Sequence, residues 1–178
     1  GLWVSDGTLA GTNLAVNFGS SGSYSSPYVP HSNKITGLQQ SKSDGFIILN
    51  QEMYFLAYDE NNGTELWRSD GTLAGTWMVK DINTGSSGSF IESMVKVGNE
   101  IFFRADDTAT WDYSNLWKSD GTEAGTVMVK DTTYSPSYLF DFNGLLIFKN
   151  GANGNLWKSD GTTSGTVSSL FSSLFSSF

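Results

Sequence analysis

The chain has 178 residues, of which 38% are hydrophobic and 14% aromatic, which is enough for one globular domain or one array of repeats. Its net charge of −8 repels phosphate groups, so nucleic acids and anionic membranes are disfavoured as partners. The absence of cysteine excludes disulfides, zinc–thiolate sites and cysteine nucleophiles, and no apolar run reaches the roughly 18–20 residues that span a bilayer.

One motif occurs four times along the chain. It reads LWVSDGTLAGT from Leu2, LWRSDGTLAGT from Leu66, LWKSDGTEAGT from Leu116 and LWKSDGTTSGT from Leu156. Successive motif tryptophans are 64, 50 and 40 residues apart, a spacing in the range of propeller blades and some helical arrays. Each copy is expected to supply two strands joined by its Asp-Gly-Thr turn.

The repeat predicts a half unit followed by three complete units. The half unit covers 1–17 and precedes an insertion at 18–44; the complete units cover 45–81, 92–131 and 137–167. Each complete unit begins with a predicted hairpin: FIILN-QE-MYFLAYD at 46–59, SMVKV-GN-EIFFRAD at 93–106 and YLFDF-NG-LLIFKN at 138–150. The tail at 168–178 is a Ser/Leu/Phe low-complexity segment, and its pattern leaves helix and strand open.

We therefore expect an all-β fold: a β-propeller-like array of four-stranded antiparallel blades, about three and a half of them, over 1–167. Helical repeats are disfavoured because Gly and Ser interrupt the chain about every 8–12 residues and no apolar stripe of helical period lasts through a unit. Since propellers close with about four to eight blades, three outcomes stay open. The chain is part of a longer propeller, copies associate, or the ends close a small ring.

The segment ELWRSDGTLAGTWMVKDI at 65–82 resembles the ELWxxDGT repeat family of large bacterial surface and secreted proteins. The matching positions are Glu65, Leu66, Trp67, Asp70, Gly71, Thr72, Gly75 and Thr76. The other copies replace the leading glutamate with Gly1, Asn115 and Asn155. The resemblance implies a propeller-like module in an exported, surface-attached, multidomain protein. The family pattern names no catalytic residue.

The repeated polar residues are interpreted as a turn and the tryptophans as packing between blades. The carboxylate of each motif aspartate can accept hydrogen bonds from amides two or three residues further on. Recurrence in every unit favours this structural role, because a catalytic site normally occurs once. The residues concerned are Trp3, Asp6, Trp67, Asp70, Trp117, Asp120, Trp157 and Asp160. Trp77, which aligns with Val127 and Val167, is expected in the core.

Two loops between the second and third strands of a unit carry candidate ligand sites. Asp59 in one, and Asp106 with Asp107 in the other, offer oxygen ligands for calcium, although neither loop has EF-hand spacing. Trp111, Asp112 and Tyr113 form a candidate sugar-binding surface, since an exposed aromatic ring can stack on a sugar face.

The leading hypothesis is a non-catalytic structural or adhesive module of an exported or cell-surface bacterial protein. It would act through copies of itself, adjoining domains of a larger protein, or other protein contacts. A glycan-binding module, with or without calcium, is the alternative. A glycoside hydrolase is more remote, since it needs two facing carboxylates that spacing cannot establish. The single histidine, His31, lacks a hydrolase signature around it, which favours an ordinary loop residue.

Overall fold

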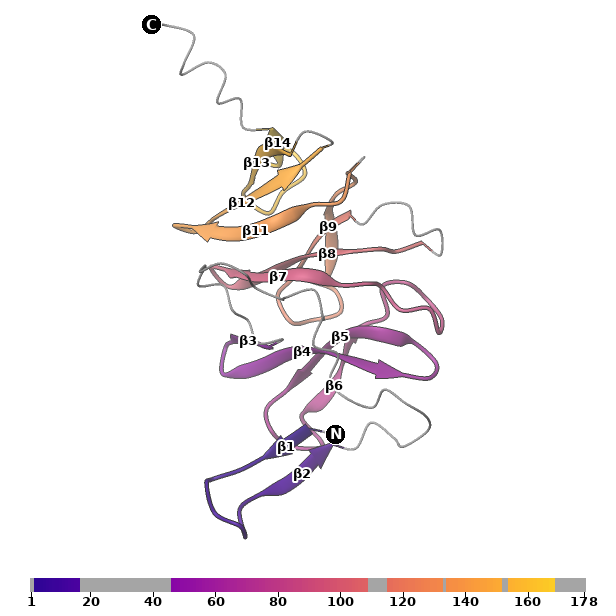
Figure 1. Ribbon diagram of the computed structural model, residues 1–178, viewed down its shortest axis with the longest axis vertical. Helices are drawn as coiled ribbons and strands as arrows, with labels where there is room; N and C mark the ends of the chain where they lie inside the picture. The colour runs from indigo at the N-terminus through magenta and orange to yellow at the C-terminus, as the bar shows by residue number, and fades with distance from the viewer. Residues whose placement is uncertain (1, 17–45, 109–114, 133, 152–153, 169–178) are drawn as a thin grey trace, which may run out of the picture.

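The described residues form three four-stranded antiparallel sheets and one pair of strands (Figure 1). The computed structural model describes residues 2–16, 46–108, 115–132, 134–151 and 154–168. Every regular secondary-structure element within these residues is a β-strand, so the all-β prediction is confirmed. The described part of the chain therefore offers no helix long and apolar enough to cross a membrane.

Each sheet is an up-and-down meander in which consecutive strands pair. The N-terminal pair consists of β1 (Leu2–Val4) and β2 (Asn13–Val16). The first sheet consists of β3 (Phe46–Leu49), β4 (Glu52–Asp59), β5 (Gly63–Ser69) and β6 (Thr76–Lys80). The second sheet consists of β7 (Glu92–Val97), β8 (Glu100–Ala105), β9 (Asn115–Ser119) and β10 (Val127–Lys130). The third sheet consists of β11 (Ser137–Phe142), β12 (Leu145–Asn150), β13 (Asn155–Ser159) and β14 (Val167–Ser168).

Each hairpin that opens a sheet has a two-residue turn with at least one residue at positive φ. Asn143 and Gly144 join β11 to β12 with φ values of 55° and 84°, as expected for a type I′ turn. In the first sheet the turn falls on Asn50 and Gln51, one residue earlier than the sequence predicted, and Glu52 opens β4. Asparagine tolerates positive φ better than glutamate does, which accounts for the shift.

The four units are stacked in a row, with the N-terminal pair at one end and the third sheet at the other (Figure 1). The opening strands β3, β7 and β11 of consecutive sheets run close to one another. The described residues form no closed ring, because the two end units lie far apart along the stack.

Each sheet has two apolar faces because strand residues alternate in direction. Across β8 and β9, for example, Phe103 pairs with Trp117 on one face, and Phe102 pairs with Lys118 on the other. We call the first the tryptophan face and the second the forward face. In the second and third sheets the tryptophan face packs against the preceding sheet, and in the first and second sheets the forward face packs against the following one, as the clusters of buried residues show.

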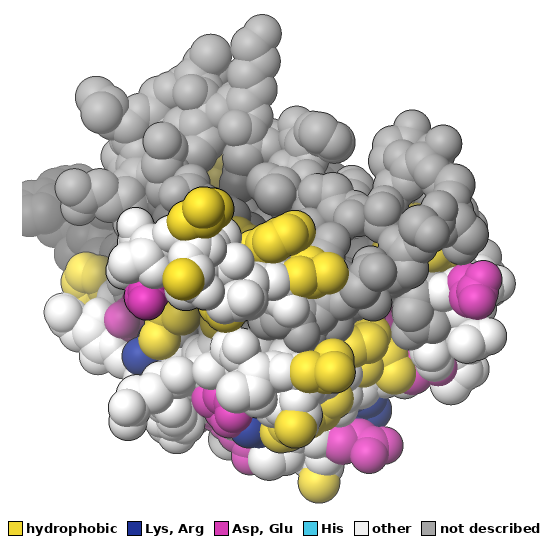
Figure 2. All heavy atoms as spheres, turned by 90° about the horizontal axis from the view of Figure 1, so that it is seen from below, with side chains coloured by type: hydrophobic (Ala, Val, Ile, Leu, Met, Phe, Trp, Pro, Cys, Tyr) yellow, Lys and Arg dark blue, Asp and Glu magenta, His cyan; other side chains and the backbone are white. Residues whose placement is uncertain are grey.

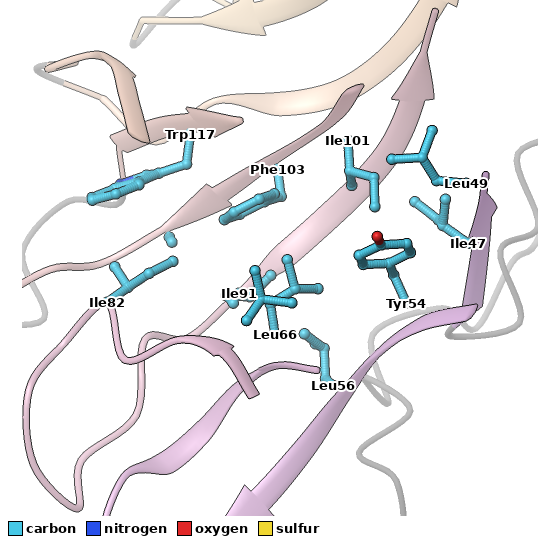
Figure 3. Packing of buried hydrophobic residues seen from close by; sticks show 12 residues of the cluster. Ile47, Leu49, Tyr54, Leu56, Leu66, Ile82, Ile91, Ile101, Phe103 and Trp117 are labelled. Atoms are coloured by element: carbon cyan, nitrogen blue, oxygen red, sulfur yellow. The ribbon is translucent and has the colours of Figure 1, made fainter. Parts of the chain in front are cut away.

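The largest cluster fills the space between the first and second sheets (Figure 3). Leu49, Tyr54 and Leu66 enter it from the forward face of the first sheet. Phe103 and Trp117 enter it from the tryptophan face of the second. A second cluster joins the second and third sheets in the same way and includes Phe102, Leu116, Phe148 and Trp157. The tryptophans of these two sheets therefore pack between sheets.

Trp77 does not lie in the core, contrary to the prediction. Its side chain is 44% exposed, and the aligned Val127 and Val167 are exposed to a similar degree. The Arg68 side chain lies over the ring, with the guanidinium carbon 4.3 Å from the ring centroid. The fourth strand of each sheet is an outer strand, so burial at this position is incomplete.

Candidate functional site

The repeated Ser-Asp-Gly-Thr turn is held by hydrogen bonds among its own polar groups. Asp70 Oδ1 accepts from the Thr72 amide at 2.9 Å and from the Thr72 hydroxyl at 2.7 Å. Thr72 Oγ1 in turn accepts from the Gly75 amide at 2.9 Å. The hydroxyls of Ser69 and Thr76 lie 2.6 Å apart and tie the two ends of the turn together. The serine, aspartate and threonine side chains of the motif are therefore all used within the turn.

The same bonds recur in all four copies, with the aspartates Asp6, Asp70, Asp120 and Asp160 in the same position. Hydrogen bonds from the following threonine lower the pKa of each carboxyl: the hydroxyl bond has the larger effect in the last three copies and the amide bond in the first. The ionised carboxylate is the form that accepts both bonds.

The turn of each complete sheet also docks on the preceding unit. In the second sheet, the Gly121 carbonyl accepts a hydrogen bond from Arg68 Nη1 of the first sheet at 3.1 Å. Arg68 is also paired with Glu52, whose carboxylate accepts from the Tyr54 hydroxyl. A side chain at Gly121 would overlap the Tyr54 hydroxyl, so only glycine fits there.

The turn of the third sheet docks on the second sheet in the same manner. A Cβ at Gly161 would lie 3.1 Å from Glu100, 3.3 Å from Lys118 and 3.3 Å from Phe102. Lys118 and Glu100 form an ion pair at 2.7 Å, at the same register positions as Arg68 and Glu52. These contacts form a repeating joint: a glycine turn seated on a ring and an ion pair of the sheet before it.

The four motif tryptophans have different environments. Trp117 is buried, whereas Trp67 and Trp157 are half-buried and pack against apolar clusters. Trp3 of the N-terminal pair is 62% exposed. The motif therefore determines where the ring points, and the neighbouring unit determines whether it is covered.

Glu65 is a buried charged group that sequence analysis did not single out. Its carboxylate accepts hydrogen bonds from the Ser89 hydroxyl and from the Ile82 amide, both in or beside the connection to the second sheet. Burial raises the pKa of Glu65 to about 7, against the opposing effect of the Ser89 bond. Asn115 occupies this place in the second sheet and accepts from the Thr132 amide at 2.9 Å. The Glu/Asn exchange at the motif's first position was the available signal.

The acids proposed for calcium have separate surroundings. Asp106 is buried, and its Oδ1 accepts from the amide and hydroxyl of Thr108 at 2.8 and 2.9 Å. Asp107 is half-buried, and the side chain of Asp59 lies outside what is described. Within the described residues, no group of three or more His, Cys, Asp and Glu side chains is placed to hold a metal ion. Calcium binding stays a prediction.

The remaining candidates lie outside the described residues. These are Trp111, Asp112 and Tyr113, proposed for sugar binding, and His31 in the insertion. The tail from 169 onward is also outside them.

No protein-family model and no curated protein matches the chain. Among solved structures, a puromycin hydrolase mutant complexed with PGG is 17% identical over 67% of this chain, with a TM-score of 0.47. A second structure, described as puromycin hydrolase, is 15% identical over 69% of this chain, again with a TM-score of 0.47. The chain spans 20% and 22% of those two chains. At this level of similarity, these matches assign no activity to this chain.

Proposed function

We propose that this chain is a non-catalytic structural or adhesive repeat module of an exported or cell-surface bacterial protein. Its sheets act as blades of a β-propeller-like array, and it works through contact with copies of itself or with adjoining domains. The bacterial and exported origin rests on the resemblance of 65–82 to the ELWxxDGT repeats.

The observation that carries the proposal is the repeating joint between units. The motif supplies most of the polar groups that recur in every unit, and these groups close the turn. The turn then seats on the preceding sheet through the Gly121 carbonyl and Arg68. The polar groups of the motif are hydrogen-bonded within the turn and the joint. This supports a structural role better than a catalytic one, since an active site needs polar groups that face a substrate.

The blade interpretation is supported by the order of the strands and by how the sheets meet. Each sheet is a four-stranded meander, and the opening strands of neighbouring sheets lie close together, as strands near a propeller axis do. Apolar clusters join each sheet to the next. An array of this kind offers further joints to other units of the same type.

Light scattering and native mass measurement over a wide range of protein concentration test this proposal. We expect association that grows with concentration and persists at high salt, because apolar contacts are not screened. Incubation with puromycin should give no hydrolysis. A chain that stays monomeric at the highest concentration, or one that turns over puromycin, would contradict the proposed function.

A further inference from the structure

The forward face of the third sheet exposes apolar side chains at positions whose equivalents in the other two sheets are buried. Leu49, Val97 and Phe142 each close their hairpin at the same register position, opposite Glu52, Glu100 and Leu145, respectively. Leu49 is fully buried against the second sheet and Val97 is 6% exposed against the third. Phe142 is 60% exposed.

The neighbouring positions on this face show the same contrast. Ile47 of the first sheet is buried, whereas Phe140 at the matching position of the third sheet is 41% exposed. Tyr138 beside it is 74% exposed. Terminal units of repeat proteins normally have a polar outer face. An aromatic outer face is typical of an interface instead.

A cation on this face lacks the ion pair found in the other sheets. Lys158 is at the register position of Arg68 and Lys118, but Leu145 replaces the glutamate that pairs with them. Among the described residues, the ion pairs do not include Lys158, which is exposed. The Lys158 ammonium group is therefore available to donate a hydrogen bond to a carbonyl or a carboxylate, as Arg68 donates to the Gly121 carbonyl.

The complementary half of the joint lies at the opposite end of the molecule. The N-terminal pair carries the same turn, closed by the same bonds around Asp6. A Cβ at Gly7 would meet nothing within 4 Å, whereas Gly121 and Gly161 each rest on a preceding sheet. Trp3, which matches the buried Trp117, is 62% exposed. Figure 2 looks at this end and shows hydrophobic side chains at its surface.

The geometry points to a head-to-tail contact between two copies of this chain: the Ser5–Thr12 turn and Trp3 of one copy dock on the forward face of the third sheet of the next. This deepens the proposed function and rests on it. The docked turn would place Gly7 over Ile147 and Lys158, as Gly121 lies over Tyr54 and Arg68. Asp6 would approach Lys158, matching the Lys118 charge that helps to lower the pKa of Asp160.

A second copy is the fitting occupant because both halves of the joint are present in one chain but at opposite ends of it (Figure 1). One molecule cannot bring its own turn onto its own third sheet without breaking the stack. A contact that joins two different surfaces leaves each copy with one free turn and one free face, so assembly continues into rings or filaments.

Two full-length variants test the two surfaces. Phe142→Asp places a charge on the forward face, and Gly7→Asn places a side chain on the free turn. Asparagine accepts the positive φ of Gly7 better than most residues. We expect each variant to weaken association, measured by sedimentation, by about tenfold or more.

Matched controls separate these effects from general ones. Leu73→Asp changes an apolar residue that is 70% exposed. It lies in a turn that already contacts the preceding unit, since a Cβ at Gly71 would be 3.5 Å from Val4. Gly85→Asn adds the same side chain at another positive-φ glycine with nothing within 4 Å. Both should leave association within about twofold of the unmodified chain. If Gly7→Asn disturbs its own turn, Leu9→Asp replaces it, since Leu9 is 96% exposed and its change strains no backbone.

Mixing the two variants gives the decisive measurement. Gly7→Asn retains its forward face and Phe142→Asp retains its turn, so the mixture should form a one-to-one complex that stops at two chains. A mixture that stays monomeric overturns the inference. So does full association of Gly7→Asn with itself, which would mean face-to-face pairing.

The failure of this inference is distinguishable from the failure of the proposed function. Association of the unmodified chain that neither variant weakens leaves the proposed function intact and overturns the head-to-tail contact. A monomeric unmodified chain overturns both. Association that both variants weaken and that the mixture restores as a two-chain complex supports both.

Discussion

The forward faces of the first and third sheets have the same construction but opposite surroundings. In the first sheet, Ile47 and Leu49 are buried against the second sheet. In the third, Phe140 and Phe142 at the matching positions are 41% and 60% exposed, although their side chains are larger. Each unit therefore has apolar residues at the register positions of an interface, whether or not a neighbouring sheet covers them. The exposed apolar face at the end of the stack is the surface on which the proposed second copy docks.

The turn glycines show the same contrast for the other half of the joint, the turn that docks. Gly121 rests on Tyr54 so closely that no side chain fits, whereas Gly7 faces open space. Both have positive φ, at 91° and 89°, so their local conformation is the same. A difference in the effect of substituting these two glycines therefore reports the contact with the preceding sheet and not the conformation of the turn.

The largest effect should come from deleting an aromatic ring inside the stack. Phe103→Ala removes a fully buried side chain between the first two sheets and should cost about 3–5 kcal/mol of unfolding free energy. Phe142→Ala, on the exposed face, should change it by less than about 0.5 kcal/mol when the chain is dilute. Urea denaturation of both variants at low concentration measures the contrast. Equal losses would mean that Phe142 is buried in the monomer.

Replacing a turn glycine with alanine should cost more unfolding free energy at docked Gly121 than at free Gly7. Gly121→Ala both strains the positive φ and pushes against the Tyr54 hydroxyl, which together should cost about 3 kcal/mol. Gly7→Ala should cost about 1 kcal/mol, because only the backbone strain applies. Thermal unfolding of the two variants under identical conditions gives the difference. A cost at Gly7 equal to that at Gly121 would show that docking contributes nothing at Gly121.

Glu65 should make the first joint sensitive to pH in a way that the second joint is not. Its pKa rises from 4.5 to about 7 on folding, so the folded state holds the proton more tightly than the unfolded state. The stability that comes from protonated Glu65 is fully present below pH 4.5 and is lost as pH rises through 7; its size is on the order of 3 kcal/mol.

The variant Glu65→Gln should remove this slope, because an amide cannot ionise, and an amide already serves at Asn115. Unfolding free energies of both proteins at a series of pH values from 4 to 8 test it. The motif aspartates act in the opposite sense: their lowered pKa values cost stability only as the pH falls below the normal carboxyl range. A slope between pH 5 and 7 that survives in Glu65→Gln would place its origin elsewhere.

The sequence predicted the strands and turns because their causes are local. The Asn143-Gly144 pair favours a type I′ turn by its own conformational preferences, and the Asp70 carboxylate reaches the Thr72 amide from two residues away. Alternation and spacing likewise predicted four-stranded units. The one-residue error at Asn50 arose because Asn-Gln is a weaker turn signal than Asn-Gly.

What the sequence could not predict depends on neighbouring units. The burial of Trp117 and the exposure of Trp3 follow from whether another sheet lies in front of the same motif. Trp77 was assigned to the core because it aligns with Val127 and Val167, but it lies on an outer strand and is covered by the Arg68 guanidinium instead. The role of Glu65 requires the chain to return past it after β6, a contact that spacing along the sequence does not reveal.

The smallest predicted effect concerns the cation over Trp77. Arg68 pairs with Trp77 across β5 and β6, and Lys118 pairs with Val127 at the same place in the second sheet. Trp77→Val therefore gives the first sheet the pairing of the second while leaving the Arg68 bond to Gly121 in place. Because the ring is 44% exposed, the loss should be only about 0.5–1 kcal/mol of cation–π energy. A double-mutant cycle with Arg68→Met isolates this energy, since coupling appears only if the two side chains interact. A loss of about 3 kcal/mol that persists in the Arg68→Met background would instead mean that Trp77 stabilises the sheet as a core residue does. The expected small and coupled loss would show that the outer strands tolerate change, while the joints beneath them hold the stack together.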